Sequence, residues 1–385
     1  LQVGMAVALL GTAGMIVRSF AQLRSVDMGF EPQGVMSFFV SLQGDAYQEV
    51  EARGAFFDQL LTRLEALPGV ESVGGVSSLR LSGFDGDITT EAAEAPIPHP
   101  GQRVAAWFRR ATPDYIETLG LSLVSGRGIE VGDQRGGPPV AVINQTLAQT
   151  HFPDLNPLGR RIAVGDPDDP LLFEVVGVVK DIRNFDVRDD FRSAVYVANA
   201  QYPAGSLFLA LRAADGMDPT SLVSGLRGAV AELDPTLAVS NVVALPDLVA
   251  DALGPDRFLA VLLGGFAALA LILAVVGLYG VVSYSVGARV RELGVRVALG
   301  ADAGTIRTRV ILASMGPVLV GVGFGLALAW VGSRFTEALL YQVSPVDPIT
   351  LSWTVLVLLV TACAAAAIPA SRAARVDPMT VLREE

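Results

Sequence analysis

The chain has 385 residues, of which 51% are hydrophobic, and a formal net charge of −11 at pH 7. Its acidity is confined to residues 25–251, which carry 16 Lys and Arg against 31 Asp and Glu, a net charge of −15. The remaining residues carry 12 Lys and Arg against 8 Asp and Glu, a net charge of +4. The acidic part excludes a nucleic-acid partner, because binding of the phosphate backbone needs excess positive charge, and a single cysteine, Cys363, excludes an internal disulfide.

The first apolar block covers residues 1–17 and is followed by Arg18 and Arg24. A signal peptide would need a basic leader and a small-residue cleavage site, and this stretch has neither. We therefore expect residues 1–24 to form a first transmembrane helix, truncated at its start. Its two arginines then lie on the outer side, against the positive-inside rule, but long translocated domains are largely exempt from that rule.

Residues 25–255 are ordinary globular sequence and are expected to form a large water-soluble domain. Apolar runs of strand length alternate here with helical patterns, which indicates an α+β fold. The character of the sequence changes near residues 112–172, which predicts a smaller inserted subdomain. The expected strands are 35–42, 70–76, 104–109, 140–143, 173–179, 194–197, 207–212 and 238–243. The expected helices are 47–67, 113–119, 144–151 and 219–233. Residues 82–100 are expected to form a loop or hairpin.

Three further apolar blocks, 258–282, 310–333 and 348–368, are long enough to cross a hydrocarbon core of about 30 Å as helices. Residues 256–385 are therefore predicted to form a domain of three transmembrane helices. Three arginines follow the last block, so the C-terminal tail is expected on the cytoplasmic side. Small residues that allow close helix contact are Gly264, Gly265, Gly277 and the i, i+4 pair Gly321 and Gly325.

The segment between two of these blocks, residues 285–311, is short and basic, with five arginines against two acidic residues. Short basic loops stay on the cytoplasmic face, so we place it there. Apolar residues recur on one helical stripe and charged residues on another, which predicts an amphipathic helix at 285–300. The apolar stripe consists of Val286, Val290, Leu293 and Val297.

Local signals support that helix. Glu292 precedes Arg296 by four residues, the favourable order for an intrahelical ion pair. Gly300 is placed to end the helix, and Asp302 is placed to cap the next one. From the residues alone, such a surface helix either receives a partner or only anchors the chain to anionic headgroups.

Other candidate sites have weaker patterns. His151 and Asp154 lack the spacing of a metal motif, so a surface or helix-end histidine is expected. The acidic turn at 166–169 lacks the twelve-residue ligand pattern of a calcium loop and is expected to be solvated. Two Gly–Arg segments, 126–128 and 159–161, are expected to be a tight turn and a solvated loop rather than anion or partner sites.

Several stretches carry a family resemblance. The segment between the blocks reads VRELGVRVALGADAGTIRTRVI, and the chain ends RAARVDPMTVLREE. Both resemble the permease family that contains MacB, FtsX and the LolC/LolE proteins. Within the large domain, PVAVINQTLAQTHFPDLNPLGRRI and FEVVGVVKDIR resemble MacB-like periplasmic core domains, most of all those in the second half of duplicated orphan permeases, and the opening residues resemble the first span of that half.

The resemblance implies an α-helical membrane protein with four transmembrane helices and an inserted α+β extracytoplasmic domain, made of a porter-like subdomain and a smaller inserted one. It places the protein in the bacterial inner membrane. The segment 285–300 would be a coupling helix that receives a cytoplasmic ABC ATPase subunit. Its expected contact residues are Arg289, Arg291, Glu292, Gly294, Arg296 and Gly300.

Relatives use this arrangement for mechanotransmission, in which ATP-driven dimerisation of the ATPase moves the outer domain. This chain departs from MacB because it has no fused ATPase and contains no G-x-x-x-x-G-K-[ST] motif. We therefore expect a non-catalytic subunit without a cofactor of its own, with ATP bound by the partner. Further expected partners are a second permease half or a homodimer partner, the lipid bilayer and, as a further candidate, a periplasmic adaptor, but no nucleic acid.

Two alternatives stay open. The first is an FtsX-like membrane regulator that activates a cell-wall hydrolase instead of exporting a substrate. The second is an extracytoplasmic receptor with a passive membrane anchor, in which the basic segment would serve no partner. The sequence identifies neither the substrate nor the ATPase.

Overall fold

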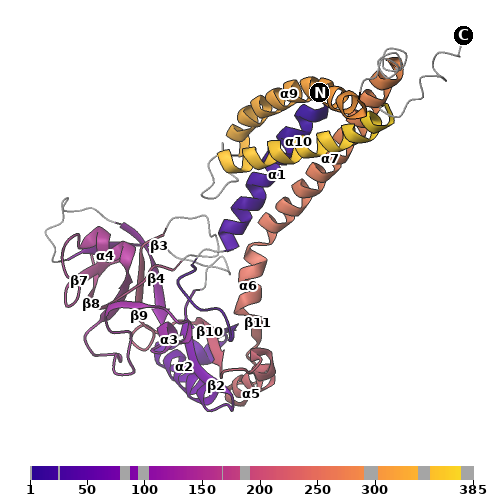
Figure 1. Cartoon of the computed structure of the whole chain (residues 1–385). Helices are drawn as coiled ribbons and strands as arrows, with labels where there is room; N and C mark the ends of the chain where they lie inside the picture. Colours follow the sequence, from indigo (N-terminus) through magenta and orange to yellow (C-terminus); the bar gives the residue numbers. More distant parts are fainter. Residues whose placement is uncertain are drawn as a thin grey trace, which may run out of the picture. The chain divides into compact units, whose positions relative to one another are not determined.

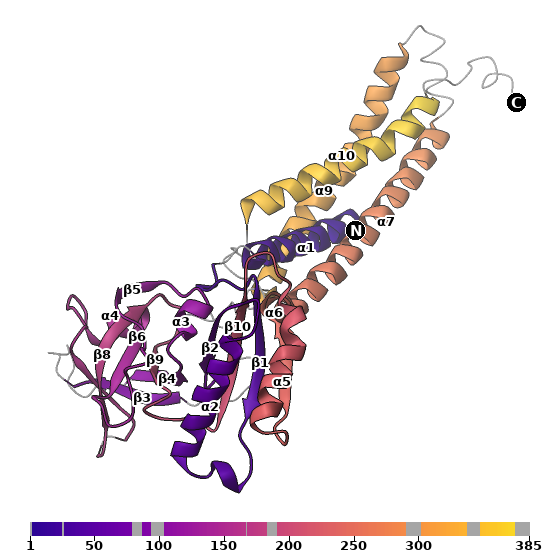
Figure 2. The same cartoon turned by 90° about the horizontal axis from the view of Figure 1, so that it is seen from below.

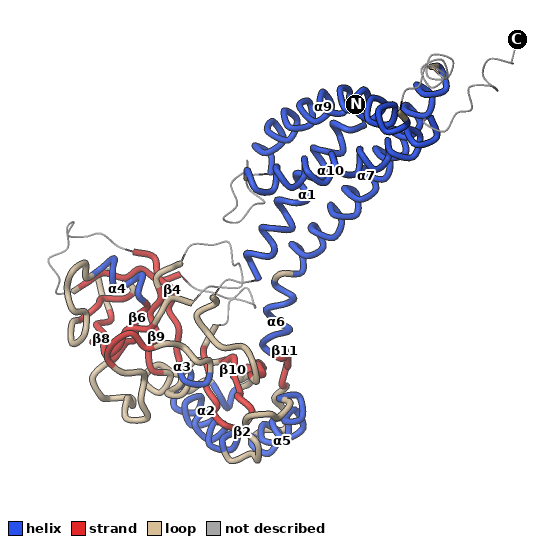
Figure 3. Tube along the Cα trace, in the orientation of Figure 1, coloured by secondary structure: helices blue, strands red, loops and turns tan. Residues whose placement is uncertain are grey.

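A computed structural model describes residues 2–24, 27–78, 87–93, 104–166, 168–182, 191–289, 302–336 and 347–373. The chain divides into two compact units. The membrane unit combines Leu1–Val26 with Gly254–Glu385, and the second unit is Asp27–Leu253. Figure 3 shows that the membrane unit is helical, whereas the second unit mixes helices and strands. The predicted fold class is confirmed.

The described part of the membrane unit contains four helices that are long and apolar enough to cross a membrane (Figure 1). They are α1 (Gln2–Arg24), α7 (Gly254–Ala288), α9 (Ala303–Thr336) and α10 (Pro348–Ala373). Large apolar side chains such as Phe258, Phe266 and Trp353 are exposed on the outside of the bundle. A hydrocarbon environment suits that surface, because lipid tails are as apolar as these side chains.

The helix α1 is the central one, because it contacts the other three and buries the largest share of its surface. Its Ala6 and Val7 are fully buried against the other helices. Small side chains on α1 allow this close approach, which in lipid depends on van der Waals packing rather than on the hydrophobic effect. The shared core consists of Ala6, Val7, Ala274, Val318, Val322, Leu358 and Ala362.

Three of the five glycines singled out in the sequence lie at these contacts. A Cβ on Gly325 would lie 2.5 Å from the backbone oxygen of Gly4, and one on Gly321 would lie 2.9 Å from the Val3 side chain. A Cβ on Gly277 would lie closer still to the Gln2 side chain. The remaining two, Gly264 and Gly265, have no described atom within 4 Å of a built Cβ. The i, i+4 pair on α9 therefore packs against α1.

Eleven strands form one sheet in the described part of the second unit. Their order is β11-β1-β10-β2-β4-β3-β7-β8-β6-β9, with β5 paired to β8. The strands are β1 (Val35–Ser41), β2 (Val70–Val76), β3 (Asp87–Ala92), β4 (Val104–Ala111), β5 (Leu123–Gly126), β6 (Val140–Asn144), β7 (Arg161–Val164), β8 (Leu171–Val179), β9 (Ala194–Ala198), β10 (Ser206–Ala213) and β11 (Val239–Ala244).

One part of this sheet is open and consists of β11, β1, β10 and β2, all antiparallel. The helices α2 (Val50–Glu65) and α5 (Val223–Leu233) lie side by side against it (Figures 1 and 2). Their apolar stripes and one face of the strands bury a common core around Phe38, Leu60 and Leu226. Phe56, Leu60 and Leu64 belong to the buried stripe of α2.

The other part closes on itself. The strand β9 pairs with β6 on one side and with β4 on the other, and β4 connects back through β3, β7 and β8 to β6. Six strands thus form a small barrel, and its interior is filled by buried apolar side chains such as Ile143, Phe173 and Val195. The helix α4 (Gln145–His151) contributes Leu147 to this core.

The smaller subdomain, taken as the barrel, covers more residues than the sequence predicts. Its strands run from β3 to β9, residues 87–198, whereas the sequence places an insertion near 112–172. The stretch expected to be a loop or hairpin contains β3, which joins the ring because Thr90 pairs with Val104 and Val164. The barrel meets the open sheet at a single paired position, Val76 with Ala111.

The remaining short helices complete the second unit. They are η1 (Asp45–Tyr47), α3 (Tyr115–Thr118), η3 (Pro219–Leu222) and α6 (Leu245–Ala252). Tyr115 of α3 is fully buried in a core shared with Trp107 and Phe208, on the face of the sheet opposite α2. This shared core connects the barrel to the open sheet.

Candidate coupling site at the ends of α7 and α9

The predicted coupling segment begins inside the helix α7. Residues Ser285 to Ala288 continue α7 without a break, and Arg289 follows in a turn whose amide donates to the Val286 carbonyl at 3.1 Å. Among the six expected contact residues, Arg289 is described and its side chain is exposed. The other five, Arg291, Glu292, Gly294, Arg296 and Gly300, lie outside the described residues.

The helix on the far side of the segment starts as the sequence predicts. The carboxylate of Asp302 accepts a hydrogen bond from the Gly304 amide at 2.9 Å, and its carbonyl accepts from the amides of Thr305 and Ile306. A side-chain oxygen at this position satisfies an amide that the first turn leaves free, which fixes where α9 begins.

A cleft of about 230 Å³ separates the last turns of α7 from the first turns of α9. Its walls are mostly apolar, and Arg289 and Arg309 are the charged residues that line it within the described part of the chain. The lining includes Leu278, Val282, Val286, Val310, Ala313 and Pro317. Such a cleft suits an apolar side chain with a nearby carboxylate, because a guanidinium group binds a carboxylate through paired N–H donors.

Pro317 shapes α9 beside this cleft. Its ring nitrogen carries no hydrogen, so the helix loses one backbone hydrogen bond there. The Ser314 hydroxyl donates to the Ile311 carbonyl at 2.7 Å in the preceding turn. Polar side chains of this kind let membrane helices tolerate proline. The cleft therefore lies beside a position where the α9 backbone lacks one hydrogen bond.

A second polar contact stabilises the same end of the bundle. The Arg372 side chain, in the last turn of α10, donates to the Tyr279 hydroxyl of α7 at 3.1 Å. Tyr279 follows Leu278, which lines the cleft. The contact therefore connects α10 to the part of α7 that forms the cleft wall.

At the opposite end, Arg18 of α1 forms an ion pair with Asp347, directly before α10. Asp347 also accepts a hydrogen bond from the Thr350 amide at 2.9 Å. The sequence reasoning missed this pair because it treats the residues before α10 only as an outer loop. The Asp–Pro order at 347–348 is a sequence signal for the role of Asp347 as a helix cap, since this order is typical of a helix start.

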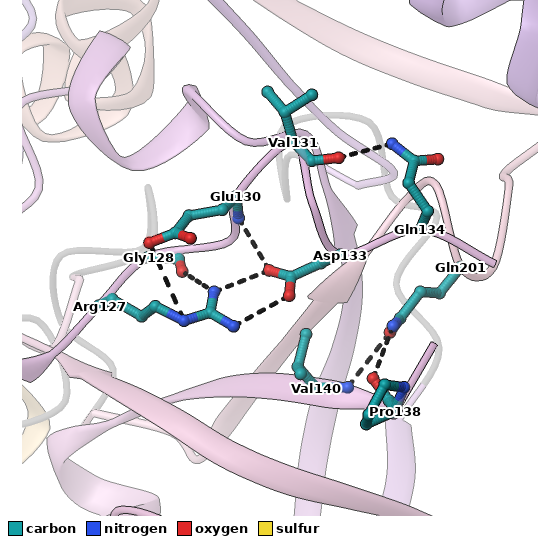
Figure 4. Close-up of polar contacts among 9 residues, drawn as sticks. All are labelled: Arg127, Gly128, Glu130, Val131, Asp133, Gln134, Pro138, Val140 and Gln201. Atoms are coloured by element: carbon teal, nitrogen blue, oxygen red, sulfur yellow. Dashed lines mark hydrogen bonds and ion pairs between the residues drawn. The ribbon is translucent and has the colours of Figure 1, made fainter. Parts of the chain in front are cut away.

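The weaker candidate sites are accounted for by local contacts. Arg127 forms two parallel hydrogen bonds with Asp133, at 2.8 and 2.9 Å, and Asp133 also accepts from the Glu130 amide at 2.8 Å (Figure 4). Burial raises the pKa of Asp133, but the bonds from Arg127 and Glu130 outweigh it and hold the pKa below its usual range. Gly126 has a φ of 77°, as a tight turn requires.

His151 is a buried core residue rather than a surface histidine. Its side chain is 1% exposed, and Nε2 lies 3.0 Å from the Thr90 hydroxyl in the barrel. Among the described residues, no group of three His, Cys, Asp or Glu side chains is arranged to hold a metal ion. The expected position at the end of a helix is confirmed, since His151 is the last residue of α4.

Comparison with known proteins matches both units to described families. Residues 3–229 match the MacB-like periplasmic core domain, and residues 264–378 match the FtsX-like permease C-terminal region. An uncharacterized ABC transporter permease, YknZ of Bacillus subtilis (strain 168), is 25% identical over 287 residues, which cover 70% of this chain and 68% of YknZ.

The macrolide export ATP-binding/permease protein MacB of Azoarcus sp. (strain BH72) is 27% identical over 285 residues. The match covers 68% of this chain and 40% of that protein, so the chain spans less than half the length of that relative. Among solved structures, the periplasmic region of MacB from Actinobacillus actinomycetemcomitans aligns with 57% of this chain and 94% of its own length, at 15% identity and a TM-score of 0.38.

Proposed function

This chain belongs to the family of the MacB-like periplasmic core domain, and from that premise we propose that it is a non-catalytic ABC transporter permease subunit, driven by a separate cytoplasmic ATPase. It is a multi-pass protein of the bacterial inner membrane with a large extracytoplasmic domain, as predicted. ATP binds to the partner, and the permease converts the partner's motion into a change of its outer domain, for export of a substrate that its residues do not identify.

The observation that carries this proposal is the cleft between α7 and α9. Arg289, directly after α7, and Arg309 of α9 lie on either side of residues 290–301, the segment that resembles the ATPase contact of the family. An ATPase that pushes on this segment therefore acts on the ends of two membrane helices at once. A passive anchor uses cations to bind anionic headgroups, but it does not need the cleft.

The helix α7 provides the path across the membrane. Its 35 residues extend about 50 Å at 1.5 Å per residue. It begins at Gly254, one residue after Leu253, the last residue of the extracytoplasmic unit. Displacement of its cytoplasmic end therefore reaches the outer domain through a single continuous helix.

The experiment is reconstitution of the full chain with its ATPase in lipid nanodiscs. Glu292→Ala and Arg296→Ala, and charge reversal by Arg289→Glu or Arg309→Glu, are expected to reduce ATPase binding and stimulation. Arg334→Glu near the other end of α9 is the matched control and is expected to change neither. Unchanged ATPase binding and activity in all four coupling variants would contradict the proposal.

The match to the FtsX-like C-terminal region supports a second candidate function, which is the activation of a cell-wall hydrolase. A pull-down with the extracytoplasmic domain distinguishes the two, because a regulator must retain a hydrolase among its bound proteins.

We further propose that the active assembly contains a second permease half or a second copy of this chain, and a periplasmic adaptor. Crosslinking in native membranes tests each of these partners.

A further inference from the structure

A second cavity lies in the extracytoplasmic unit, between the start of α2 and the barrel. Its volume is about 550 Å³, within the range of small-molecule sites. Arg53 of α2, Arg110 of β4 and Arg135 of the loop before β6 line it, and we call it the arginine cavity. No acidic residue lines it in the described part of the chain. Three converging cations are unexpected in a segment whose net charge is −15.

Arg53 is held in place by the backbone. Its Nε donates to the Tyr47 carbonyl at 2.7 Å, and one terminal nitrogen donates to the Gln48 carbonyl at 3.1 Å. These bonds use two of the five N–H donors of the guanidinium group, and no carboxylate of the described residues pairs with its charge. The fixed side chain belongs to the first helical turns of α2, where the helix dipole also favours an anion.

Arg110, like Arg53, is partly buried. Its Nε is inaccessible to solvent and has no hydrogen-bond partner among the described residues. Its guanidinium carbon lies 5.5 Å from the centre of the Phe108 ring. Burial, and then the nearby charge of Arg53, lower the pKa of Arg110. A partly buried cation without a carboxylate partner is unfavourable, and an anion in the cavity would offset its charge.

Arg135 completes the set from the barrel side. It forms an ion pair with Glu51, whose side chain is 68% exposed. This contact shows that Arg135 can hold a carboxylate at the edge of the cavity. The neighbouring Gly136 and Gly137 have no side chains, so a ligand can approach the loop backbone closely.

The rest of the wall is rigid and largely apolar. Gln201 fixes the loop that forms one side, because its amide accepts from the Val140 amide at 3.1 Å and donates to the Pro138 carbonyl at 2.8 Å (Figure 4). Tyr202 is held by its ring contact with Phe173, at 5.3 Å between centroids. Val50, Pro139 and Pro203 provide the remaining apolar surface.

We propose that the arginine cavity binds a small organic anion, whose carboxylate or phosphate contacts the three arginines and whose apolar part lies against Tyr202 and the two prolines. The anion would contact α2 on one side and the barrel on the other, so its binding would also stabilise their arrangement. The proposal concerns the extracytoplasmic unit alone and does not depend on the proposed ATPase coupling.

The test is calorimetric titration of the full chain in lipid nanodiscs at physiological salt. The probes are phenyl phosphate and benzoate, with benzamide as the neutral control of the same shape and inorganic phosphate as the anion without an apolar part. Both organic anions are expected to bind, benzamide is not, and inorganic phosphate is expected to bind more weakly than phenyl phosphate. Equal binding of benzamide and benzoate would overturn the anion site, and equal binding of the two phosphates would overturn the apolar contact.

Variants locate the binding. Arg53→Gln and Arg135→Gln are each expected to weaken phenyl phosphate binding by about tenfold or more, because each removes a charge-assisted contact. Arg160→Gln, a half-buried arginine of the same unit outside the cavity, is the control and is expected to bind as the unmodified chain does. Unchanged affinity in the Arg53→Gln/Arg135→Gln double variant, or equal loss in the control, would refute the site.

Glu51→Gln gives a test in which the expected result is tighter binding, which misfolding cannot produce. Removal of this carboxylate frees Arg135 and deletes a negative charge that is paired with a residue of the cavity wall. Phenyl phosphate is therefore expected to bind several-fold more tightly. Weaker or unchanged binding in this variant would contradict the assigned role of Arg135.

Discussion

Arg18 of α1 and Asp347 at the start of α10 form an ion pair although 329 positions separate them in the sequence. Asp347 acts in two ways, because it also caps α10 through the Thr350 amide. Hydrogen bonding from Thr350, and then the charge of Arg18, lower the pKa of Asp347 against the effect of its burial. The carboxylate therefore stays ionised and connects the first and last membrane helices.

The two roles of Asp347 can be separated by mutation. Asp347→Ala removes both the cap and the ion pair and is expected to reduce the free energy of unfolding by about 1–2 kcal/mol. Arg18→Gln removes only the pair and is expected to cost less, about 0.2–1 kcal/mol. Thermal unfolding of the full chain in detergent measures both. If Arg18→Gln costs as much in the Asp347→Ala background as alone, the two residues do not interact.

The contact of α9 with α1 predicts a strong position dependence for glycine replacement. Gly325→Leu is expected to destabilise the bundle by about 1–3 kcal/mol, because the new side chain would collide with the backbone of Gly4 and with Val7. Gly323→Leu is the matched control, since no described atom lies within 4 Å of a Cβ there. It is expected to be neutral or stabilising, because glycine is a poor helix former. Equal melting temperatures for the two variants would exclude this packing.

The buried His151 predicts a pH dependence of stability. Burial lowers its pKa, with smaller opposing effects from Glu91 and from the Thr90 hydrogen bond. The unfolded chain, with a histidine pKa of about 6.5, then binds more protons than the folded chain below that pH. Stability is therefore expected to fall as the pH drops from about 7.5 to 5.5. His151→Gln should flatten this slope.

Trp107 gives the readout for that experiment, because it is buried in the same unit while the other two tryptophans lie in the membrane helices. Thermal unfolding is followed by its fluorescence in a Trp330→Phe/Trp353→Phe background. A slope as steep in His151→Gln as in the parent chain would assign the pH dependence to another group.

The cleft between α7 and α9 predicts the effect of filling it. Ala313→Trp places a large ring among the lining residues and is expected to reduce stimulation of the reconstituted ATPase by about fivefold, the change that about 1 kcal/mol produces. Ala327→Trp, at an exposed position further along α9, is the control. Full stimulation by the Ala313→Trp protein would remove the cleft from the coupling path.

Local patterns predicted most elements but not their long-range pairing. The membrane helices were readable because uncharged runs of this length have few other stable structures. The strand β3, with the sequence DITTEA, lacks an apolar run and was expected to be part of a loop or hairpin. It is a strand because β4 and β7 supply hydrogen-bonding partners from other parts of the chain.

The candidate sites divide in the same way. The basic segment at 285–311 was found because its charge pattern is local, and the contact roles of Arg291, Glu292, Gly294, Arg296 and Gly300 stay predictions. The arginine cavity draws on four separate stretches, from α2 to the residues after β9. No spacing rule connects Arg53, Arg110 and Arg135, so only the fold could bring them together.

The closed ring of six strands has a consequence for recognition. Because β9 pairs on both sides, the ring offers no free backbone edge of its own along that strand within the described residues. A protein that binds the barrel at β9 cannot add a strand to it and must contact its turns and side chains instead. Changes in those turns could therefore redirect the domain toward new ligands while the hydrogen-bonded frame beneath them stays the same.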